Sequence, residues 1–434
     1  MGTDIDTRYL IIGNSAGAIG AAEAIRELDT AGSLTMVSDE PYPVYSRPLI
    51  SKYLTGERTL DTMLYRPRAF YEQNGIRSLL GRTVLRLDLE SRIVELAGGQ
   101  RIAWEKLLLA PGGVPIMPPM EGRDKNGVFS FTTLDDARAL DEHLARSDKA
   151  VVIGGGLIGI SVTEALQKRG VKVTVVEMKD RILNTILDET ASSLAEERVV
   201  EAGVQVITGC TVAEITGRDW VTGVVLDDGR DIRCGVVVVA IGVSPRIGLA
   251  ADAGIEVNRG ILVDDRMATS MADVYACGDA VEAYDFVYEV RRPVPIWPNA
   301  YIGGRVAGQN MAGREARYAG GTTMNALNYF GMDIASAGMV VPPEGGEGYE
   351  TVSRHAGGVY RRVVARKGII MGMVFVGDID KSGIVYGLMK DRTDVSGLDE
   401  KLVADDFGLA HLPRAVWQER LEAPPVEAGG LAAG

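Results

Sequence analysis

Hydrophobic and polar positions near the start of the chain predict a strand, a tight turn, a helix and a second strand. The apolar run Tyr9–Ile12 leads into a turn of small residues, Gly13–Ala18. Ala21–Leu28 is rich in alanine and predicts a helix, and Leu34–Val37 predicts the next strand, which ends at two adjacent acids. The pattern therefore predicts a β-turn-α-β unit with an acidic end.

The same pattern returns in the middle of the chain. Lys149–Ile153 predicts a strand, and Gly154–Gly159 follows as a glycine-rich turn. Ile160–Arg169 predicts a helix and Val171–Val176 a second strand, which ends at Glu177. Two such units in one chain are a form of internal repeat.

Further strands are predicted between and after these units. Lys106–Leu109 and Val236–Ala240 are continuous apolar runs, which is typical of buried parallel strands. Alternating stretches predict two hairpins, formed by Thr83–Asp88 with Arg92–Leu96 and by Gly223–Leu226 with Asp231–Cys234.

The pattern changes after about Thr322. Val359–Arg366 and Ile369–Gly377 predict antiparallel strands, and Ser382–Lys390 predicts a helix. The last residues, 413–434, are rich in glycine, alanine and proline, so we expect a loose tail.

Composition excludes several classes of protein. The 434 residues suggest about three domains. The 46 basic and 59 acidic residues give a net charge of −13, which argues against a nucleic-acid partner. The three cysteines and three histidines are widely spaced, so we expect no metal site and a reducing compartment. An acidic N-terminus and short apolar runs predict a cytoplasmic protein without a membrane span.

The second glycine turn predicts a dinucleotide site. Glycines 154, 156 and 159 allow a tight turn close to a pyrophosphate, and the helix that follows Leu157 and Ile158 directs its N–H groups to that anion. Glu177 is placed to accept hydrogen bonds from an adenosine ribose and would repel a 2′-phosphate, which favours NAD(H). The basic neighbours Lys179 and Arg181 weaken that preference.

The first turn departs from the usual pattern. After Gly13, Ser15 stands where the second glycine would be and Ala18 where the third would be, with Ala16 and Gly17 between them. Alanine is allowed at the third position. A serine can still donate a hydrogen bond to phosphate, at some steric cost. The acid that would bind the ribose is Asp39 or Glu40, and the sequence leaves both open.

These two units, together with the segment Val274–Ala280, resemble the FAD- and NAD(P)-dependent pyridine nucleotide oxidoreductases. The resemblance covers roughly Tyr9 to Pro413. It implies that the first unit holds FAD and the second NAD(H), and that Asp279, after Gly278, binds the ribityl–phosphate arm of the flavin. Further cofactor-binding positions implied by the resemblance are Arg47, Lys52, Val84, Ala110, Gly112, Gly242 and Trp297.

The resemblance also implies the fold. We expect an α/β protein with two Rossmann-like dinucleotide-binding domains, the FAD domain being interrupted by the NAD domain, and a C-terminal α+β interface domain. The expected boundaries are FAD-binding parts at 1–113 and 245–322, an NAD-binding domain at 114–244, an interface domain at 323–412 and a flexible tail at 413–434.

The missing cysteines indicate the subfamily. No cysteine precedes Cys210, so dithiol chemistry beside the flavin has no carrier. Arg47-Pro48 and Ser51-Lys52 instead resemble ferredoxin and rubredoxin reductases, in which the lysine lies near flavin N5 and acts in catalysis. The overall likeness is to NADH-oxidising subunits that serve iron–sulfur proteins, such as the NAD-binding subunit of phenylglyoxylate dehydrogenase.

Four positions depart from this subfamily. One is Pro111, because the usual Ala-Thr-Gly appears as Ala110-Pro111-Gly112. Ser161 replaces a glutamate that pairs with the lysine near N5, which would leave Lys52 without this partner. Thr132 replaces an arginine that contacts the flavin, and Gly303 replaces a glutamine after the tryptophan segment.

The function implied is hydride transfer from NADH to FAD, followed by electron transfer to an iron–sulfur protein or subunit. We expect an oligomer or a subunit of a larger complex. The alternatives are a free-standing NADH oxidase or diaphorase, and a redox-gated interaction protein similar to apoptosis-inducing factor.

Overall fold

A computed structural model describes residues 5–412, and the predicted tail lies outside these residues. The chain divides into two compact units. The first comprises residues up to 184 together with 195–323, and the second comprises residues 185–194 together with those from 324 onward. Each unit is described by itself below.

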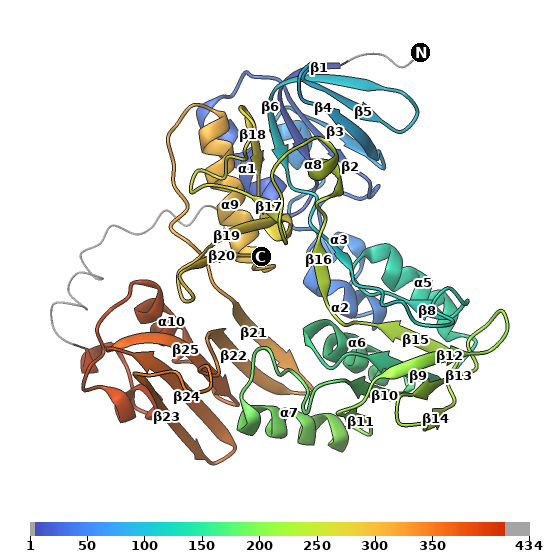
Figure 1. The fold of residues 1–434 in the computed structure, drawn as a ribbon, viewed down its shortest axis with the longest axis vertical. Helices are drawn as coiled ribbons and strands as arrows, with labels where there is room; N and C mark the ends of the chain where they lie inside the picture. The colour runs from blue at the N-terminus through green and yellow to red at the C-terminus, as the bar shows by residue number, and fades with distance from the viewer. Residues whose placement is uncertain (1–4, 413–434) are drawn as a thin grey trace. The chain divides into compact units, whose positions relative to one another are not determined.

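The first sheet of the first unit is built around strand β1 and has the strand order β3-β2-β1-β6-β5-β4, with β18 also paired to β6 (Figure 1). Strands β1, β2, β3, β6 and β18 are parallel, and β4 and β5 form an antiparallel hairpin. Their bounds are β1 Ile5–Ile12, β2 Leu34–Ser38, β3 Ile76–Leu80, β4 Val84–Asp88, β5 Ile93–Leu96, β6 Arg101–Leu109 and β18 Val274–Ala276.

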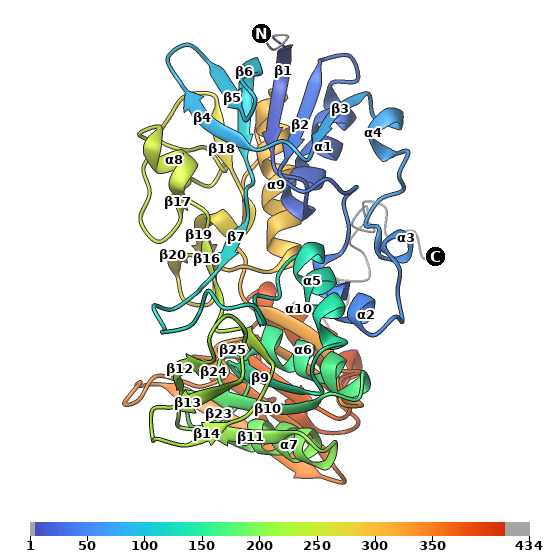
Figure 2. The same ribbon diagram turned by 90° about the vertical axis from the view of Figure 1, so that its right-hand side faces the viewer.

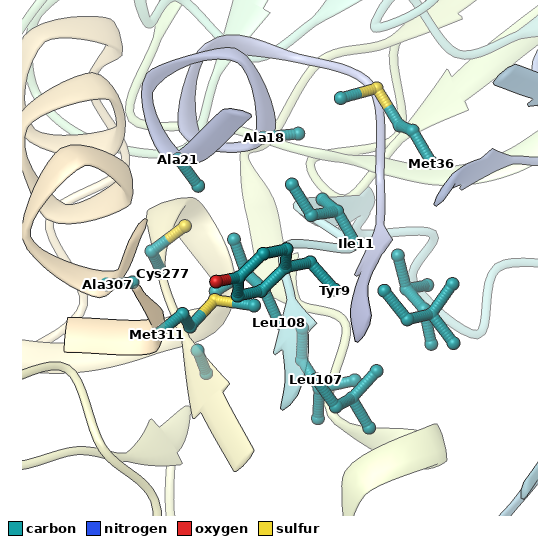
Figure 3. Packing of buried hydrophobic residues seen from close by; sticks show 14 of the residues in the cluster. Tyr9, Ile11, Ala18, Ala21, Met36, Leu107, Leu108, Cys277, Ala307 and Met311 are labelled. Carbon is teal, nitrogen blue, oxygen red and sulfur yellow. The ribbon is translucent and has the colours of Figure 1, made fainter. Parts of the chain in front are cut away.

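Two helices, α1 (Ala16–Leu28) and α9 (Trp297–Met311), pack closely against each other beside this sheet. Small residues make this approach possible, because a Cβ at Gly17 would lie 2.7 Å from Cys277 Sγ and 3.2 Å from the carbonyl oxygen of Ala300. Figure 3 shows the result, with Cys277 enclosed between the helices and the strand residues Tyr9 and Leu108.

The second sheet is parallel and has the order β11-β10-β9-β15-β8. Its strands are β8 Val128–Phe129, β9 Lys149–Ile153, β10 Lys172–Glu177, β11 Gln205–Thr208 and β15 Val236–Val239. Helices α5 (Leu134–Leu144) and α6 (Leu157–Lys168) belong to the same unit, and α7 (Glu189–Glu201) continues into it from residue 195. A small antiparallel sheet follows, with β12 Val212–Thr216, β13 Gly223–Leu226 and β14 Asp231–Ile232.

The chain enters and leaves the region of the second sheet through two paired strands. β7 (Gly113–Pro115) and β16 (Val243–Pro245) form an antiparallel pair with Ser244 opposite Val114, and Figure 2 shows them side by side. The rest of the unit consists of α2 Ile50–Leu54, α3 Leu60–Met63, α4 Phe70–Gln73, α8 Gly248–Asp252, β17 Ile261–Leu262, β19 Val281–Asp285 and β20 Val290–Arg292.

The second unit is an antiparallel sheet of order β21-β22-β25-β24-β23 with helix α10 (Ser382–Lys390). Its strands are β21 Met324–Tyr329, β22 Met332–Gly338, β23 Tyr349–Ala356, β24 Val359–Arg366 and β25 Ile369–Val376. Residues 185–194 group with this sheet, although the sequence placed them within the NAD domain. Asp188 is buried there and accepts hydrogen bonds from the Tyr360 hydroxyl (2.6 Å) and Arg362 Nη1 (3.1 Å).

The predicted fold class is confirmed: two α/β sheets, the second inserted into the first, and a C-terminal α+β unit. The parallel runs and both hairpins form as expected, and β24 and α10 have the predicted bounds. Within the described residues no helix is long and apolar enough to cross a membrane, and no group of three or more metal-ligating side chains is found.

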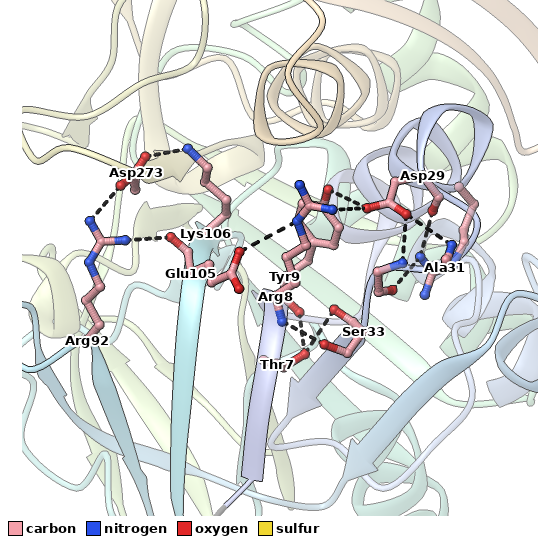
Figure 4. Close-up of polar contacts among 12 residues, drawn as sticks. Thr7, Arg8, Tyr9, Asp29, Ala31, Ser33, Arg92, Glu105, Lys106 and Asp273 are labelled. Atoms are coloured by element: carbon pink, nitrogen blue, oxygen red, sulfur yellow. Dashed lines mark hydrogen bonds and ion pairs between the residues drawn. The ribbon is translucent and has the colours of Figure 1, made fainter.

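The prominent charge clusters of the first sheet lie away from its glycine turn. Figure 4 shows that Asp29 accepts hydrogen bonds from Arg8 (2.7 Å) and Tyr9 (2.9 Å), which lie in β1. It also shows Asp273 in ion pairs with Arg92 (2.7 Å) and Lys106 (2.5 Å). These contacts join β1, β6 and the segment before β18. Asp29 and Asp273 come before β2 and β18, so these contacts lie toward the amino ends of the parallel strands. The glycine turn follows β1, at the carboxyl ends of the strands.

Candidate functional site

The turn after β9 has the geometry of a dinucleotide site. Gly154 has a φ of +106°, which favours glycine, and its N–H donates to the Val176 carbonyl at 2.8 Å. Gly156 has an ordinary φ of −80°, and a Cβ built there would meet no atom within 4 Å. Neither the backbone nor packing requires glycine at this position, so the space suits a bound pyrophosphate. Leu157 and Ile158 then begin helix α6, and Gly159 packs against the carbonyl of Gly154.

Glu177 lies beside this turn at the end of β10. Its Oε2 accepts a hydrogen bond from the Gly155 N–H (2.6 Å), and its Oε1 accepts one from the Lys179 N–H (2.8 Å). Each oxygen keeps a lone pair for a ribose hydroxyl. Of the two basic neighbours, Arg181 forms an ion pair with Asp180 (2.8 Å). The structure therefore brings Glu177 to the turn, as the sequence predicts.

The turn after β1 is similar. Gly13 has a φ of +126°, its N–H donates to the Val37 carbonyl at 2.8 Å, and a Cβ there would collide with the carbonyl oxygen of Ala110. Ser15 is the N-cap of α1, and among the described residues its side chain makes no capping hydrogen bond. Ala16 and Gly17 form the first turn of the helix. The Ser15 hydroxyl thus stands at a helix N-terminus, where an anion is favoured.

The sequence analysis missed Asn14. Its side chain donates to the Tyr42 carbonyl (3.1 Å) and accepts from the Tyr71 hydroxyl (2.8 Å), which in turn accepts from the Val44 N–H (2.9 Å). These bonds fix the loop that carries Arg47 and Lys52 onto the first turn. The signal in the sequence that could have identified Asn14 is its polar side chain between Gly13 and Ser15.

The two candidate acids of the first unit have different surroundings. Asp39 is exposed and pairs with Arg246 through Oδ2 at 2.8 Å. Glu40 uses both carboxylate oxygens, one for Arg47 and one for the Tyr45 hydroxyl (2.6 Å). The segment before Val84 also reaches this edge, because the N–H groups of residues 81 and 82 donate to the carbonyls of residues 40 and 38.

Asp279 follows β18 in a short helical turn, after Gly278, whose φ is +78°. Burial raises the pKa of its carboxyl from 3.8 to about 6, and Arg47 opposes this rise. Among residues 5–412 no hydrogen bond or ion pair to this carboxylate is found. A carboxylate placed in this way lacks the donors that it needs, and the hydroxyls of a flavin's ribityl arm would supply them. FAD therefore fits the residues present.

The remaining predicted positions lie at the turn after β1 and at the junction of the paired strands β7 and β16. The carbonyl oxygen of Ala110 is the atom that a Cβ at Gly13 would meet. The Gly112 carbonyl accepts a hydrogen bond from the Arg246 N–H (3.0 Å). Gly242 has a φ of +119° and its carbonyl accepts from the Ile116 N–H (3.0 Å), so it belongs to the junction of the paired strands.

Trp297 begins helix α9 and is half-buried. Its ring packs edge-on against Tyr65, with 4.9 Å between the ring centroids. Gly303 lies on the same helix and is buried, so a larger side chain would have to displace Met267, whose Sδ lies 3.4 Å from the position of a Cβ.

Lys52 has an ion-pair partner other than the glutamate that Ser161 replaces. Its Nζ lies 3.3 Å from Glu57, which also approaches Lys168 on α6 (3.4 Å), and Lys168 pairs with Glu164 (3.2 Å). The sequence analysis missed this chain of alternating charges because Glu57 lies in a polar loop without a recognisable motif. Thr132, the other substituted position, accepts from Arg47 Nη1 through its carbonyl (3.1 Å).

All three cysteines are buried. Burial raises the pKa of the Cys277 thiol to about 12 and that of the Cys234 thiol to about 11, and it also raises the pKa of Cys210. Cys277 packs against Gly17 within the core, and the other two lie just outside the strands on which they were expected. Thiols of this kind are protonated at neutral pH and are poor nucleophiles.

Comparisons with known proteins agree with this geometry. Residues 7–304 match the pyridine nucleotide-disulphide oxidoreductase family, and residues 324–393 match the rubredoxin NAD+ reductase C-terminal domain. The chain is 33% identical over 405 residues to the NADH-dependent phenylglyoxylate dehydrogenase subunit epsilon of Aromatoleum evansii, covering 93% of this chain and 96% of that one. It is 30% identical over 306 residues to a rubredoxin-NAD(+) reductase of Pseudomonas putida, covering 70% and 80%.

Among solved structures, the ferredoxin reductase for the CYP199A2 system from Rhodopseudomonas palustris is similar, with a TM-score of 0.84 and 26% identity, covering 93% of this chain and 99% of that one. Both the extent of the family match and the two dinucleotide turns lead to the same assignment. The chain belongs to the pyridine nucleotide-disulphide oxidoreductase family and is an FAD-dependent NADH oxidoreductase.

Proposed function

We propose that this protein oxidises NADH through bound FAD and passes the electrons to an iron–sulfur protein or subunit. The observation that carries the proposal is the combination of two dinucleotide turns in one unit with three buried, protonated thiols. Electrons that arrive from NADH then have no dithiol to pass through. The printed names of the similar proteins, which include a rubredoxin reductase and a dehydrogenase subunit, favour the same kind of acceptor.

In this proposal the first turn binds FAD. Gly13, Ser15 and the N-terminus of α1 hold the pyrophosphate, and Asp279 accepts hydrogen bonds from the ribityl arm. Asp39 is the ribose ligand, because its Oδ1 is available, whereas both oxygens of Glu40 are engaged. FAD, when bound, supplies the step from a two-electron donor to one-electron acceptors.

The chain's own groups orient the substrate and supply charge. Gly156 and the start of α6 hold the pyrophosphate of NADH, and Glu177 selects its unphosphorylated ribose. Lys52 supplies positive charge beside the flavin, and Glu57 restrains its ammonium group. Trp297, held by Tyr65, excludes water from the flavin site.

The protein is further proposed to act in the cytoplasm, as an oligomer or as a subunit of a larger complex. The C-terminal unit, which matches the rubredoxin reductase domain, is the part proposed to meet the electron acceptor.

Rapid-mixing measurements test the function. The purified holoenzyme is mixed with NADH, and its oxidation is followed with ferricyanide, with a rubredoxin or ferredoxin, with oxygen and with a disulfide substrate. We expect fast turnover with the one-electron acceptors and little with oxygen or the disulfide. Replacement of Cys210, Cys234 and Cys277 by alanine should leave flavin-normalised turnover within about twofold.

Two results would contradict the proposal. Faster reduction of oxygen than of any one-electron acceptor would make the protein an oxidase. Loss of activity in the triple cysteine variant, with FAD still bound, would show that a thiol carries electrons.

A further inference from the structure

We propose that Glu40 is a positioning residue that holds the Arg47 guanidinium in the flavin site, and that it does not bind the ribose of FAD. The inference rests on the proposed function only in taking the first turn as the FAD site. It separates the roles of two adjacent acids that occupy the same edge of the sheet, Asp39 and Glu40.

The carboxylate of Glu40 is enclosed by partners from the loop that follows it. Arg47 Nη2 donates to Oε1, and the Tyr45 hydroxyl donates to Oε2 at 2.6 Å. Only 15% of the Glu40 side chain is exposed, and Tyr45 is buried. A carboxylate that accepts a charged donor on one oxygen and a buried hydroxyl on the other is fixed in orientation.

The same cluster is tied to the N-terminus of helix α5. The Tyr45 hydroxyl accepts from the Leu134 N–H (3.0 Å), and Arg47 Nη1 donates to the Thr132 carbonyl (3.1 Å). The guanidinium also lies over the Tyr45 ring, 5.6 Å from its centroid. Arg47 is therefore held from three directions, and Glu40 provides the only negative charge in hydrogen-bond contact with it among the described residues.

The Arg47 guanidinium acts on the carboxyl group of Asp279. Arg47 lowers the pKa of this carboxyl against the effect of burial, so the two groups lie within electrostatic reach of each other. The fixed guanidinium thus favours the charged form of Asp279, and its remaining N–H groups are left for the flavin or its phosphates. Without Glu40 the guanidinium, whose side chain is 38% exposed, would be held only by the Thr132 carbonyl and the Tyr45 ring.

Asp39 differs in each respect. It is exposed, it contacts Arg246 through one oxygen, and its other oxygen is available. Glu177 can bind a ribose because each of its oxygens accepts only one backbone N–H, whereas the oxygens of Glu40 accept from a charged guanidinium and a buried hydroxyl. The chain therefore uses the first acid for the ligand and the second for an arginine.

The test measures FAD release from the holoenzyme after dilution, by the rise in flavin fluorescence. Glu40→Gln should speed release about tenfold. In the Arg47→Met background the same substitution should change release by less than twofold, because its effect passes through Arg47. Glu27→Gln, which alters an exposed pair with Arg305 on α1 and α9, is the matched control and should change nothing.

A second measurement uses the enzyme loaded with an FAD analogue that lacks the 2′-hydroxyl of its adenosine. Asp39→Asn should weaken retention of FAD much more than retention of the analogue, and Glu40→Gln should weaken both equally. Equal, additive losses for Glu40→Gln with and without Arg47, or a loss seen with FAD alone, would overturn the proposal.

These measurements need no electron acceptor. If the iron–sulfur partner proposed above proves wrong while FAD is still bound at the first turn, the release rates still decide the role of Glu40. Circular dichroism and a thermal unfolding curve for each variant show that it is folded.

Discussion

The carboxylate of Glu177 accepts a hydrogen bond from the backbone N–H of Gly155, 22 residues earlier in the chain. This bond joins the acid at the end of β10 to the turn that would hold the pyrophosphate. The two recognition elements for NADH are therefore one rigid structure, and a change in the acid should affect both nucleotide choice and binding.

We expect NADH to be preferred over NADPH, and Glu177→Gln to reduce this preference at least tenfold. The variant removes the charge that repels a 2′-phosphate while keeping an acceptor for Gly155. The measurement is kcat/KM for flavin reduction by each nucleotide. An unchanged ratio would show that Glu177 does not face the ribose. Asp180→Asn, which alters the neighbouring exposed acid, serves as the control.

Asp279→Ala should weaken FAD retention about tenfold or more. A charge-assisted hydrogen bond contributes roughly 1.5–3 kcal/mol, and the side chain has no other partner among the described residues. The flavin-to-protein ratio after extended dialysis gives the result. A folded variant that keeps a full complement of FAD would refute the assignment of this residue.

The flavin-free protein should lose stability as the pH rises through 6, because of Asp279. Its folded pKa of about 6 lies above the ordinary value of 3.8, so the folded state binds more protons between these values. The stabilising effect is full below pH 3.8 and is lost above 6, and the change is at most about 3 kcal/mol. Chemical unfolding from pH 4 to 7 should show a flatter profile in Asp279→Asn. Identical slopes would mean that this carboxyl titrates normally.

Glu57→Gln should lower the rate of flavin reduction by NADH several-fold without a matching change in the KM for NADH. The variant frees the Lys52 ammonium, which Glu57 holds at 3.3 Å. Ser161, Glu164 and Lys168 share one face of α6, so Ser161→Glu places a new carboxylate on this face.

The double variant Glu57→Gln/Ser161→Glu should recover part of the lost rate. If Ser161→Glu has the same effect in the presence and absence of Glu57, the two carboxylates do not serve the same lysine. Rapid mixing under anaerobic conditions measures the rates, and Lys52→Met sets the lower limit.

Strong periodicity made much of the fold predictable. The β24 strand and helix α10 form at the predicted residues, and both parallel strands with continuous apolar runs are buried. Helix α1 was predicted too short because its first turn contains Gly17 and Gly20, which disfavour a helix in isolation. The close approach of α9 explains these glycines, and that contact joins residues almost 300 positions apart, which a local pattern does not report.

The candidate site was predictable where it depends on turns. Both glycine turns lie between a strand and a helix, and Glu177 lies at the end of its strand, as the pattern predicted, whereas the role of Asp279 was implied by the resemblance alone. The contacts of Asn14, Tyr45 and Glu57 were not predictable, because they join side chains whose neighbours are set by the folded loop rather than by a repeat. For the same reason the sequence left Asp39 and Glu40 equivalent.

The pairing of β7 with β16 bears on whether the inserted domain can be removed from the protein. The chain departs from the first sheet and returns to it through adjacent strands, with Gly113 opposite Pro245. The backbones of two paired strands lie about 5 Å apart, so residues 113 and 245 can be joined by a short loop. A short loop costs little closure entropy, so the first sheet does not need the residues between them to hold these two strands together. A short turn that joins residues 113 and 245 should therefore let the first sheet fold without residues 114–244, as if the NADH-binding module had been acquired by insertion. Flavin retention should fall in this shortened protein, because the contacts of Arg47 and Tyr45 with Thr132 and Leu134 are removed.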